Sequence, residues 1–228
     1  MTSSSTDRAT VRVKICGLTR PGDAALAAGL GASFLGFVFA PSPRQADPDD
    51  VAMWLPDVRA AFPGVRSVGV FVNPTDEQLR SALARVDLDL VQIHRRASAP
   101  DIDVPWIRAV HPNELPSGQS RSPWAWLVDT PSANQAGGTG KTFDWSVLPT
   151  PPRPYRLFLA GGLAPENVAE AVRLARPYAV DASSRLESQP GCKDPTKLAE
   201  FFDAVRGTET RAGAGAGESE ASGARDES

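Results

Sequence analysis

Two side chains that can exchange protons lie at the ends of apolar runs in this sequence. Cys16 follows the alternating run Val11–Ile15 and precedes Gly17, whose backbone can turn tightly and let a ligand approach the sulfur. Asp129 ends the apolar run Trp126–Val128, where partial desolvation raises the pKa of a carboxyl group and suits it to general-acid work. A thiol base and a carboxylic acid, without a metal-binding motif, indicate proton shuttling of the kind an isomerase performs.

The residues after Cys16 predict the start of a helix. Thr19 is a candidate N-cap, Pro21 suits the first turn, and Asp23 favours the positive end of the helix dipole. A thiol beside a helix N-terminus has its pKa lowered from the reference of about 8.5. The alternative is a buried Cys16 that packs as a small hydrophobe.

The composition predicts a globular protein without a membrane span or a disulfide framework. Of the 228 residues, 41% are hydrophobic, and no apolar run approaches the length of about 18 residues that a membrane span needs. Residues 1–10 lack the apolar core of a signal peptide, which predicts a cytoplasmic location. The two cysteines and two histidines, with no CxxC motif, argue against disulfides and structural zinc.

Both ends of the chain are predicted to be disordered tails around one domain. Residues 1–10 are rich in Ser and Thr, and residues 207–228 are rich in Gly, Ala, Ser and Glu without apolar periodicity. The C-terminal tail carries the whole net charge of −3. The domain at 11–206 is therefore balanced and has no basic excess for nucleic acid.

Eight short apolar runs predict a (β/α)₈ barrel. They lie at 11–15, 34–39, 68–72, 88–94, 106–110, 124–128, 156–160 and 178–180, and helices are predicted at 23–31, 48–61, 75–85, 145–148, 165–175 and 194–206. Helical signal is poor after the fourth and fifth runs, so one or two outer helices are expected to be short or missing. A doubly wound sheet is the alternative. The strand count and the polar residues at the run ends, which share one face in a barrel, favour the barrel.

Two loops predict a phosphate site. Gly161 and Gly162 follow the seventh run, and Asp181, Ser183 and Ser184 follow the eighth. Barrels commonly bind phosphate at this place, where glycine amides, hydroxyls and a helix N-terminus face the anion. The alternative is that the two glycines only turn the chain.

The segment Gly137–Thr142 resembles a nucleotide-binding GxxxxGK[ST] loop. Gln135 stands where the first glycine of that motif would fall. We therefore reject ATP binding and predict a flexible loop over the mouth of the barrel.

Three further side chains carry groups capable of chemistry. Lys14 could form a Schiff base, but no activating cation lies beside it in the sequence, so a structural lysine is favoured. His94 and His111 end the fourth and fifth runs. They could line the pocket, His94 as a substrate-binding residue, with a packed or exposed imidazole as the alternative.

Several segments resemble, in order, the motifs of a known enzyme family. They are Lys14–Thr19, Gly36–Phe39 with Ser42–Arg44, Val68–Asn73, Val91–His94, Leu127–Thr130, Gly137–Trp145, and Ala160–Leu163 with Pro165–Val168. Together they are similar to phosphoribosylanthranilate isomerases, from about Arg12 to Arg206. The resemblance implies a (β/α)₈ enzyme of tryptophan biosynthesis that performs an Amadori rearrangement without a cofactor. It would bind a small phosphorylated substrate, not nucleic acid or membrane, as a monomer or homodimer.

The resemblance also implies roles for individual residues. Asp129 matches the general acid that protonates the furanose ring oxygen, and Cys16 matches the general base that takes the proton from the sugar C2. Arg44 matches an arginine near the anthranilate end, where a fixed cation suits a carboxylate. Gly162 with Ser183–Ser184 matches the phosphate cradle.

Two positions depart from the family pattern. Arg95 follows His94, and Arg185 follows Ser184, where the family usually has glycine. Arg185 could add a phosphate contact or point outward. Two other functions stay open. One is a histidine-pathway or dual-substrate aminoaldose isomerase, which usually has two aspartates. The other is a catalytically silent phosphate-binding relative, against which the presence of both Cys16 and Asp129 argues.

Overall fold

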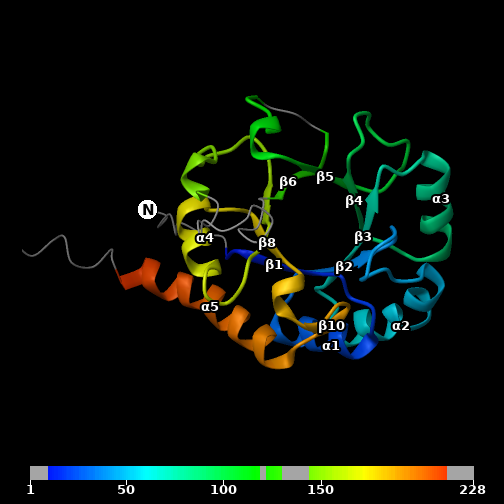
Figure 1. Cartoon of the computed structure of the whole chain (residues 1–228), viewed down its shortest axis with the longest axis horizontal. Helices are drawn as coiled ribbons and strands as arrows, with labels where there is room; N and C mark the ends of the chain where they lie inside the picture. Colours follow the sequence, from blue (N-terminus) through cyan, green and yellow to red (C-terminus); the bar gives the residue numbers. More distant parts are fainter. Residues whose placement is uncertain (1–9, 119–121, 130–143, 215–228) are drawn as a thin grey trace, which may run out of the picture.

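Eight parallel strands close into a barrel in the order in which they occur in the chain (Figure 1). The structure is a computed structural model that describes residues 10–118, 122–129 and 144–214. The strands are β1 (Arg12–Cys16), β2 (Phe34–Val38), β3 (Arg66–Val72), β4 (Leu90–His94), β5 (Trp106–Val110), β6 (Ala125–Asp129), β7 (Leu157–Ala160) and β8 (Ala179–Ala182). Because β8 pairs with β1, the predicted barrel is confirmed and the doubly wound sheet is excluded.

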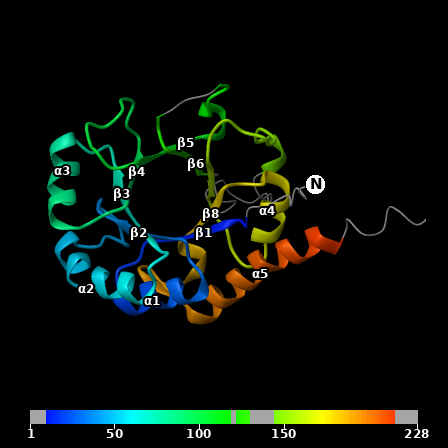
Figure 2. The same ribbon diagram turned by 180° about the vertical axis from the view of Figure 1, so that it is seen from behind.

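Over the described part of the chain, five α-helices pack outside the ring of strands (Figures 1 and 2). They are α1 (Pro21–Leu30), α2 (Pro48–Ala61), α3 (Asp76–Arg85), α4 (Val168–Ala175) and α5 (Pro195–Ala214). Local signals start several of them: Thr75 and Gln78 form a capping box before α3, and the Asp194 carboxylate accepts from the backbone N–H of Thr196 before α5. In the described ranges no helix is long and apolar enough to cross a membrane.

The sector around β4, β5 and β6 is covered by loops rather than by α-helices (Figure 1). Between these strands the described residues form only one short 3₁₀ turn, η1 (Pro112–Glu114), and a second such turn, η2 (Trp145–Val147), follows β6. Ile102 and Val104 from the loop before β5 pack against a small apolar cluster that includes Trp106. The prediction that one or two outer helices are short or missing after the fourth and fifth strands is therefore confirmed for the residues that the structure describes.

Three predicted boundaries need correction. Thr19 does not cap α1, because its hydroxyl donates to the carbonyl oxygen of Gly191 at 2.7 Å and Arg20 occupies the cap position. α4 begins at Val168 rather than Pro165, because the side chain of Asn167 braces the preceding turn. α5 continues to Ala214, beyond the end predicted near Arg206.

Some predictions fall on residues that the structure does not describe. The predicted loop at Gly137–Thr142 lies outside the described residues, as do 1–9 and 215–228 at the two ends. The division of the chain into a domain and two disordered tails stays a prediction.

The inward side chains divide the barrel into an apolar floor and a polar upper layer. The floor contains Phe34, Leu90, Ile107 and Phe158, with Phe34 and Phe158 in edge contact at 5.2 Å between ring centroids. Alternation along each strand places the later inward residues nearer the carboxyl ends. The floor closes the barrel at the amino ends of the strands, so the space for a ligand lies at the carboxyl ends.

A short hairpin after β8 was not predicted. It consists of η3 (Ser184–Leu186), β9 (Glu187–Gln189) and β10 (Cys192–Lys193), with Gly191 in the left-handed region at φ 78°. The hairpin precedes α5 and brings Glu187 and Lys193 close to the carboxyl ends of the strands.

Candidate active site

A cavity of about 280 Å³ opens at the carboxyl ends of the strands. It is lined by residues from strand ends and the loops that follow them: Cys16, Val38, Arg44, Val70, Gln92, His94, Leu127, Asp129, Ala160, Gly161, Gly162, Leu163, Asp181, Ser183, Ser184 and Arg185. Every residue predicted from the sequence to be catalytic or substrate-binding lies in this lining. His111 does not, and its backbone N–H is bound by the Glu114 carboxylate in η1.

The Cys16 thiol lies against the neighbouring strand at a place where only glycine leaves room. Cys16 at the end of β1 is opposite Gly36 of β2, and a Cβ added to Gly36 would come within 2.9 Å of the sulfur. Burial raises the pKa of the Cys16 thiol, and the ammonium groups of Lys14 and Lys193 counter only part of that rise. The prediction of a pKa lowered by the helix N-terminus is therefore wrong in direction.

Asp129 ends β6 at the mouth of the cavity, where its side chain is exposed on one side. Partial desolvation raises the pKa of its carboxyl group, the negative charge of Asp181 adds to the rise, and His111 and Lys14 oppose it. This is the direction predicted from the sequence. A carboxyl group with a raised pKa keeps its proton to higher pH, as a general acid needs.

A buried ion pair adjoins the cavity, and one of its partners, Asp181, lines it. The Lys14 ammonium on β1 donates to Asp181 Oδ2 on β8 at 2.7 Å, and both side chains are buried. Burial lowers the pKa of Lys14, but the Asp181 carboxylate and the Cys16 sulfur outweigh it, so the pKa is raised. A lysine that stays protonated is a poor Schiff-base nucleophile, which favours the structural interpretation of Lys14.

His94 is held as a neutral ring. Its Nε2 lies 2.8 Å from the side-chain nitrogen of Gln92, and because an amide nitrogen only donates, Nε2 accepts. Burial, together with the charges of Lys14 and Arg95, lowers the pKa of His94 to about 4. Arg95 adopts the left-handed conformation, at φ 57°. Glycine adopts this conformation without strain, which explains why it suits this position in the family that the sequence resembles.

The half-buried, neutral His94 predicts a fold that loses stability in mild acid. In the unfolded chain the histidine gains its proton near pH 6.5, whereas in the native protein it does so at about 4. The contribution of the neutral His94 to the free energy of unfolding is complete above pH 6.5 and is lost as the pH falls to about 4. The total loss is on the order of 3 kcal/mol at most. Denaturant unfolding measured across this range should show the loss, and His94→Gln should flatten the curve. Parallel curves for the two proteins would contradict the assignment.

The first of the two predicted phosphate loops has a backbone that requires glycine. Gly161 and Gly162 have φ of 94° and 64°, in the left-handed region. The Asn167 side chain fixes this turn by donating to the Gly162 carbonyl oxygen at 3.0 Å and accepting from the Ala164 N–H at 2.9 Å. The Ser183 hydroxyl donates to the Cys16 carbonyl oxygen at 3.0 Å, so the loop after β8 is tied to the end of β1.

Arg185 lies at the rim of the cavity, and a contact with phosphate stays a prediction. Its guanidinium donates to Glu166 Oε1 at 2.6 Å, and the residue also lines the cavity. Because this pair is exposed to solvent, it holds the arginine at the rim with little contribution to stability.

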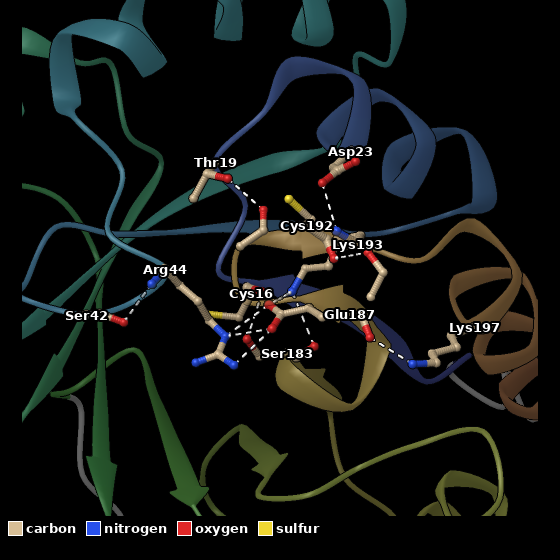
Figure 3. A network of polar contacts seen from close by, with 12 residues as sticks. Cys16, Thr19, Asp23, Ser42, Arg44, Ser183, Glu187, Cys192, Lys193 and Lys197 are labelled. Carbon is tan, nitrogen blue, oxygen red and sulfur yellow. Dashed lines mark hydrogen bonds and ion pairs between the residues drawn. The ribbon is translucent and has the colours of Figure 1, made fainter.

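Arg44 is bound by a glutamate that the sequence analysis did not identify. Its Nε lies 3.0 Å from each carboxylate oxygen of Glu187, and its Nη2 lies 2.9 Å from Oε2. Figure 3 shows Lys193 on the other side of this carboxylate, with Nζ 2.8 Å from Oε1. The arginine at the cavity is thus one end of a polar network that runs through Glu187 to Lys193.

Comparison with known proteins identifies the family. Residues 13–204 match the family described as N-(5'-phosphoribosyl)anthranilate (PRA) isomerase. The chain belongs to this family. Among curated PRA isomerases, that of Listeria monocytogenes is 41% identical over 204 residues, which cover 86% of this chain and 99% of the relative.

Solved PRA isomerases have the same fold. The phosphoribosyl anthranilate isomerase of Thermotoga maritima superimposes with a TM-score of 0.69 at 35% identity, covering 86% of this chain and 99% of the other. A second PRA isomerase structure, with a TM-score of 0.64 at 31% identity and the same coverage, is a complex with reduced 1-(o-carboxyphenylamino)-1-deoxyribulose 5-phosphate. In the described part of this family member, no three His, Cys, Asp or Glu residues form a group that could hold a metal ion.

Proposed function

We propose that this chain converts N-(5'-phosphoribosyl)anthranilate to 1-(o-carboxyphenylamino)-1-deoxyribulose 5-phosphate by general acid and base catalysis, without a cofactor. The supporting observation is that one cavity holds Cys16, Asp129, Arg44 and both glycine and serine loops. Family membership and the ligand of the related complex point to the same reaction.

The acid step opens the sugar ring. Asp129 donates its proton to the furanose ring oxygen, the bond from C1 to that oxygen breaks, and the nitrogen lone pair forms the Schiff base at C1. The raised pKa of the Asp129 carboxyl group supports this role, because the group must be protonated when substrate arrives.

The base step moves a proton from carbon. The Cys16 thiolate takes the C2 proton, and the electron pair of that bond moves toward the cationic nitrogen to give an enolamine. The enolamine then gains a proton at C1 and loses the proton of its C2 hydroxyl, which leaves the ketone. The positive charges of Lys14 and Lys193 favour the thiolate against the cost of burial.

The two ends of the substrate are both anionic. Arg44 faces the carboxylate of the anthranilate ring, and the loops at Gly161–Gly162 and Ser183–Ser184 face the phosphate. These contacts hold the sugar between Cys16 and Asp129, so that binding energy orients the reacting atoms.

The Arg44→Ala variant is expected to bind substrate more weakly. Loss of a charge-assisted contact of about 1.5–3 kcal/mol corresponds to a rise in KM of roughly 10- to 140-fold. The kcat should change less, because the contact is made equally in the ground and transition states. Steady-state kinetics would measure both, and an unchanged KM with a lower kcat would move Arg44 into the chemical step.

The decisive experiment is the decrease in fluorescence of phosphoribosylanthranilate with purified protein. Turnover would support the proposal, and its absence under conditions where a related PRA isomerase is active would indicate a silent relative. The same protein should be tested with the aminoaldose substrate of the histidine pathway. We expect no turnover of that substrate, because β1 ends in Cys16, where that chemistry usually has an aspartate.

A further inference from the structure

We propose that Glu187, held by Lys193, is a positioning residue for Arg44 and fixes the guanidinium for the substrate carboxylate. The inference rests on the proposed function, which assigns that carboxylate to Arg44. It adds two residues of the hairpin β9–β10 to the site, neither of which lines the cavity.

Glu187 binds one edge of the guanidinium and leaves another open. Nε and Nη2 of Arg44 both contact its carboxylate. No described residue accepts a hydrogen bond from Nη1 of Arg44, and Figure 3 shows one terminal nitrogen pointing away from Glu187. A guanidinium has donors enough to bind two carboxylates at once, so Glu187 and a ligand can be bound together.

The Arg44 side chain is also confined from the other side. A Cβ added to Gly17 would lie 2.8 Å from Arg44 Cδ, so the chain after β1 passes close to the arginine stem. The backbone N–H of Arg44 donates to the Ser42 hydroxyl at 3.1 Å. A side chain ordered before the ligand arrives loses less conformational entropy on binding.

Lys193 anchors Glu187 to the rest of the barrel. The side chains of Glu187 and Lys193 are 3% and 0% exposed. Lys193 Nζ lies 2.8 Å from Glu187 Oε1, so the buried carboxylate has a cation on the side opposite to Arg44 as well. Lys193 Nζ also donates to the Ser183 carbonyl oxygen at 3.3 Å, and its backbone N–H donates to Asp23 in α1 at 2.9 Å. Figure 3 shows this chain of contacts from α1 through the hairpin to Arg44.

The charges alone do not explain the arrangement. A glutamate beside Arg44 reduces the attraction of the arginine for a substrate carboxylate, so a site built only on charge would do better without it. Glu187 can strengthen the binding of the substrate carboxylate only by fixing the position of the Arg44 guanidinium. The two views differ in the sign of the effect on KM when the charge of Glu187 is removed.

The test is a double-mutant cycle on KM with Glu187→Gln, Arg44→Ala and the double variant. We expect Glu187→Gln to raise KM about 5- to 10-fold with kcat within about twofold, and to add nothing in the Arg44→Ala background, because its effect passes through Arg44. A wild-type or lowered KM in Glu187→Gln would overturn the proposal. So would effects that multiply in the double variant.

Two further variants guard against a folding defect. Glu187→Gln leaves the Lys193 ammonium buried without its counter-charge, which is destabilising. The variant E187Q/K193M removes both charges, should fold, and should show the same rise in KM; a folded variant with wild-type KM would contradict the inference. Lys197→Met is the matched control, since the Lys197 ammonium donates to the backbone oxygen of Glu187 and not to its carboxylate, and the KM of this variant should stay unchanged.

The outcomes separate this inference from the proposed function. A wild-type protein that does not turn over phosphoribosylanthranilate contradicts both. An active wild type whose Glu187→Gln variant keeps its KM contradicts only the positioning role.

Discussion

The Asp129→Asn variant is expected to lose kcat by ~10²–10⁴-fold, because the amide has no acidic proton to give to the ring oxygen. The ring must open before the C2 proton becomes acidic, so the later steps cannot compensate. The KM should change little, since asparagine has the size and hydrogen-bonding reach of the carboxyl group. Steady-state kinetics with phosphoribosylanthranilate would measure the effect, and a variant that retains more than half of the wild-type kcat would remove Asp129 from the role of general acid.

Stability provides the control for this variant. Asp129 is exposed at the cavity mouth, so the substitution should leave the free energy of unfolding within about 0.5 kcal/mol of wild type. Asp57→Asn on α2 is a matched change at another exposed aspartate, and it should keep full activity.

The Cys16→Ser variant is expected to lose kcat by a comparable ~10²–10⁴-fold, because a serine hydroxyl is far less acidic than a thiol and supplies almost no anionic base near neutral pH. In the wild type the thiolate is the active form, so kcat/KM should rise with pH as the free enzyme's thiol ionises. Burial raises the pKa of the Cys16 thiol, which places that rise on the alkaline side of an ordinary cysteine.

Cys192 makes the assignment of the base testable by alkylation. Cys192 lies on β10, outside the cavity lining, so Cys192→Ser should keep full activity and should still be inactivated by iodoacetamide. Turnover by Cys16→Ser at a rate comparable to wild type would show that the base is another group.

The strands and the position of the site could be predicted from the sequence because each is marked by residues that are close together in the chain. Each buried strand is a short apolar run, and in a closed parallel barrel every strand end faces the same side. The position of Cys16, Asp129 and Asp181 after such runs therefore predicts that they share one face of the barrel.

The hairpin residues could not be found in the same way. Glu187 and Lys193 lie in a segment with no apolar periodicity, and charged residues there are typical of a solvated loop. Their burial depends on contacts with Arg44 and with Asp23, each more than a hundred residues away. The Pro190–Gly191 pair was the available signal, since it marks a turn that brings the flanking residues together.

The errors at Thr19 and Cys16 have the same origin. Thr19 has the side chain of an N-cap, but Gly191, which is 172 residues away, accepts its hydrogen bond. The pKa of Cys16 was judged from the helix that follows it, whereas burial against Gly36 and the barrel interior dominates. In both cases a contact distant in sequence outweighed a local preference.

The closure of the barrel between β1 and β8 has a consequence for how this chain acquires activity. Lys14 and Asp181 are 167 residues apart, and the entropic cost of joining such distant segments must be met before their contact stabilises the chain. Cys16 comes from the first strand, whereas Glu187, Lys193 and the serine loop follow the last. A nascent or partly folded chain that lacks β8 and the segments after it therefore has the base, the acid and the loop at Gly161–Gly162, but it has neither the serine loop nor the anchor for Arg44. Catalytic competence is thus a property of the closed ring, and it arises only when β8 and the hairpin after it have joined β1.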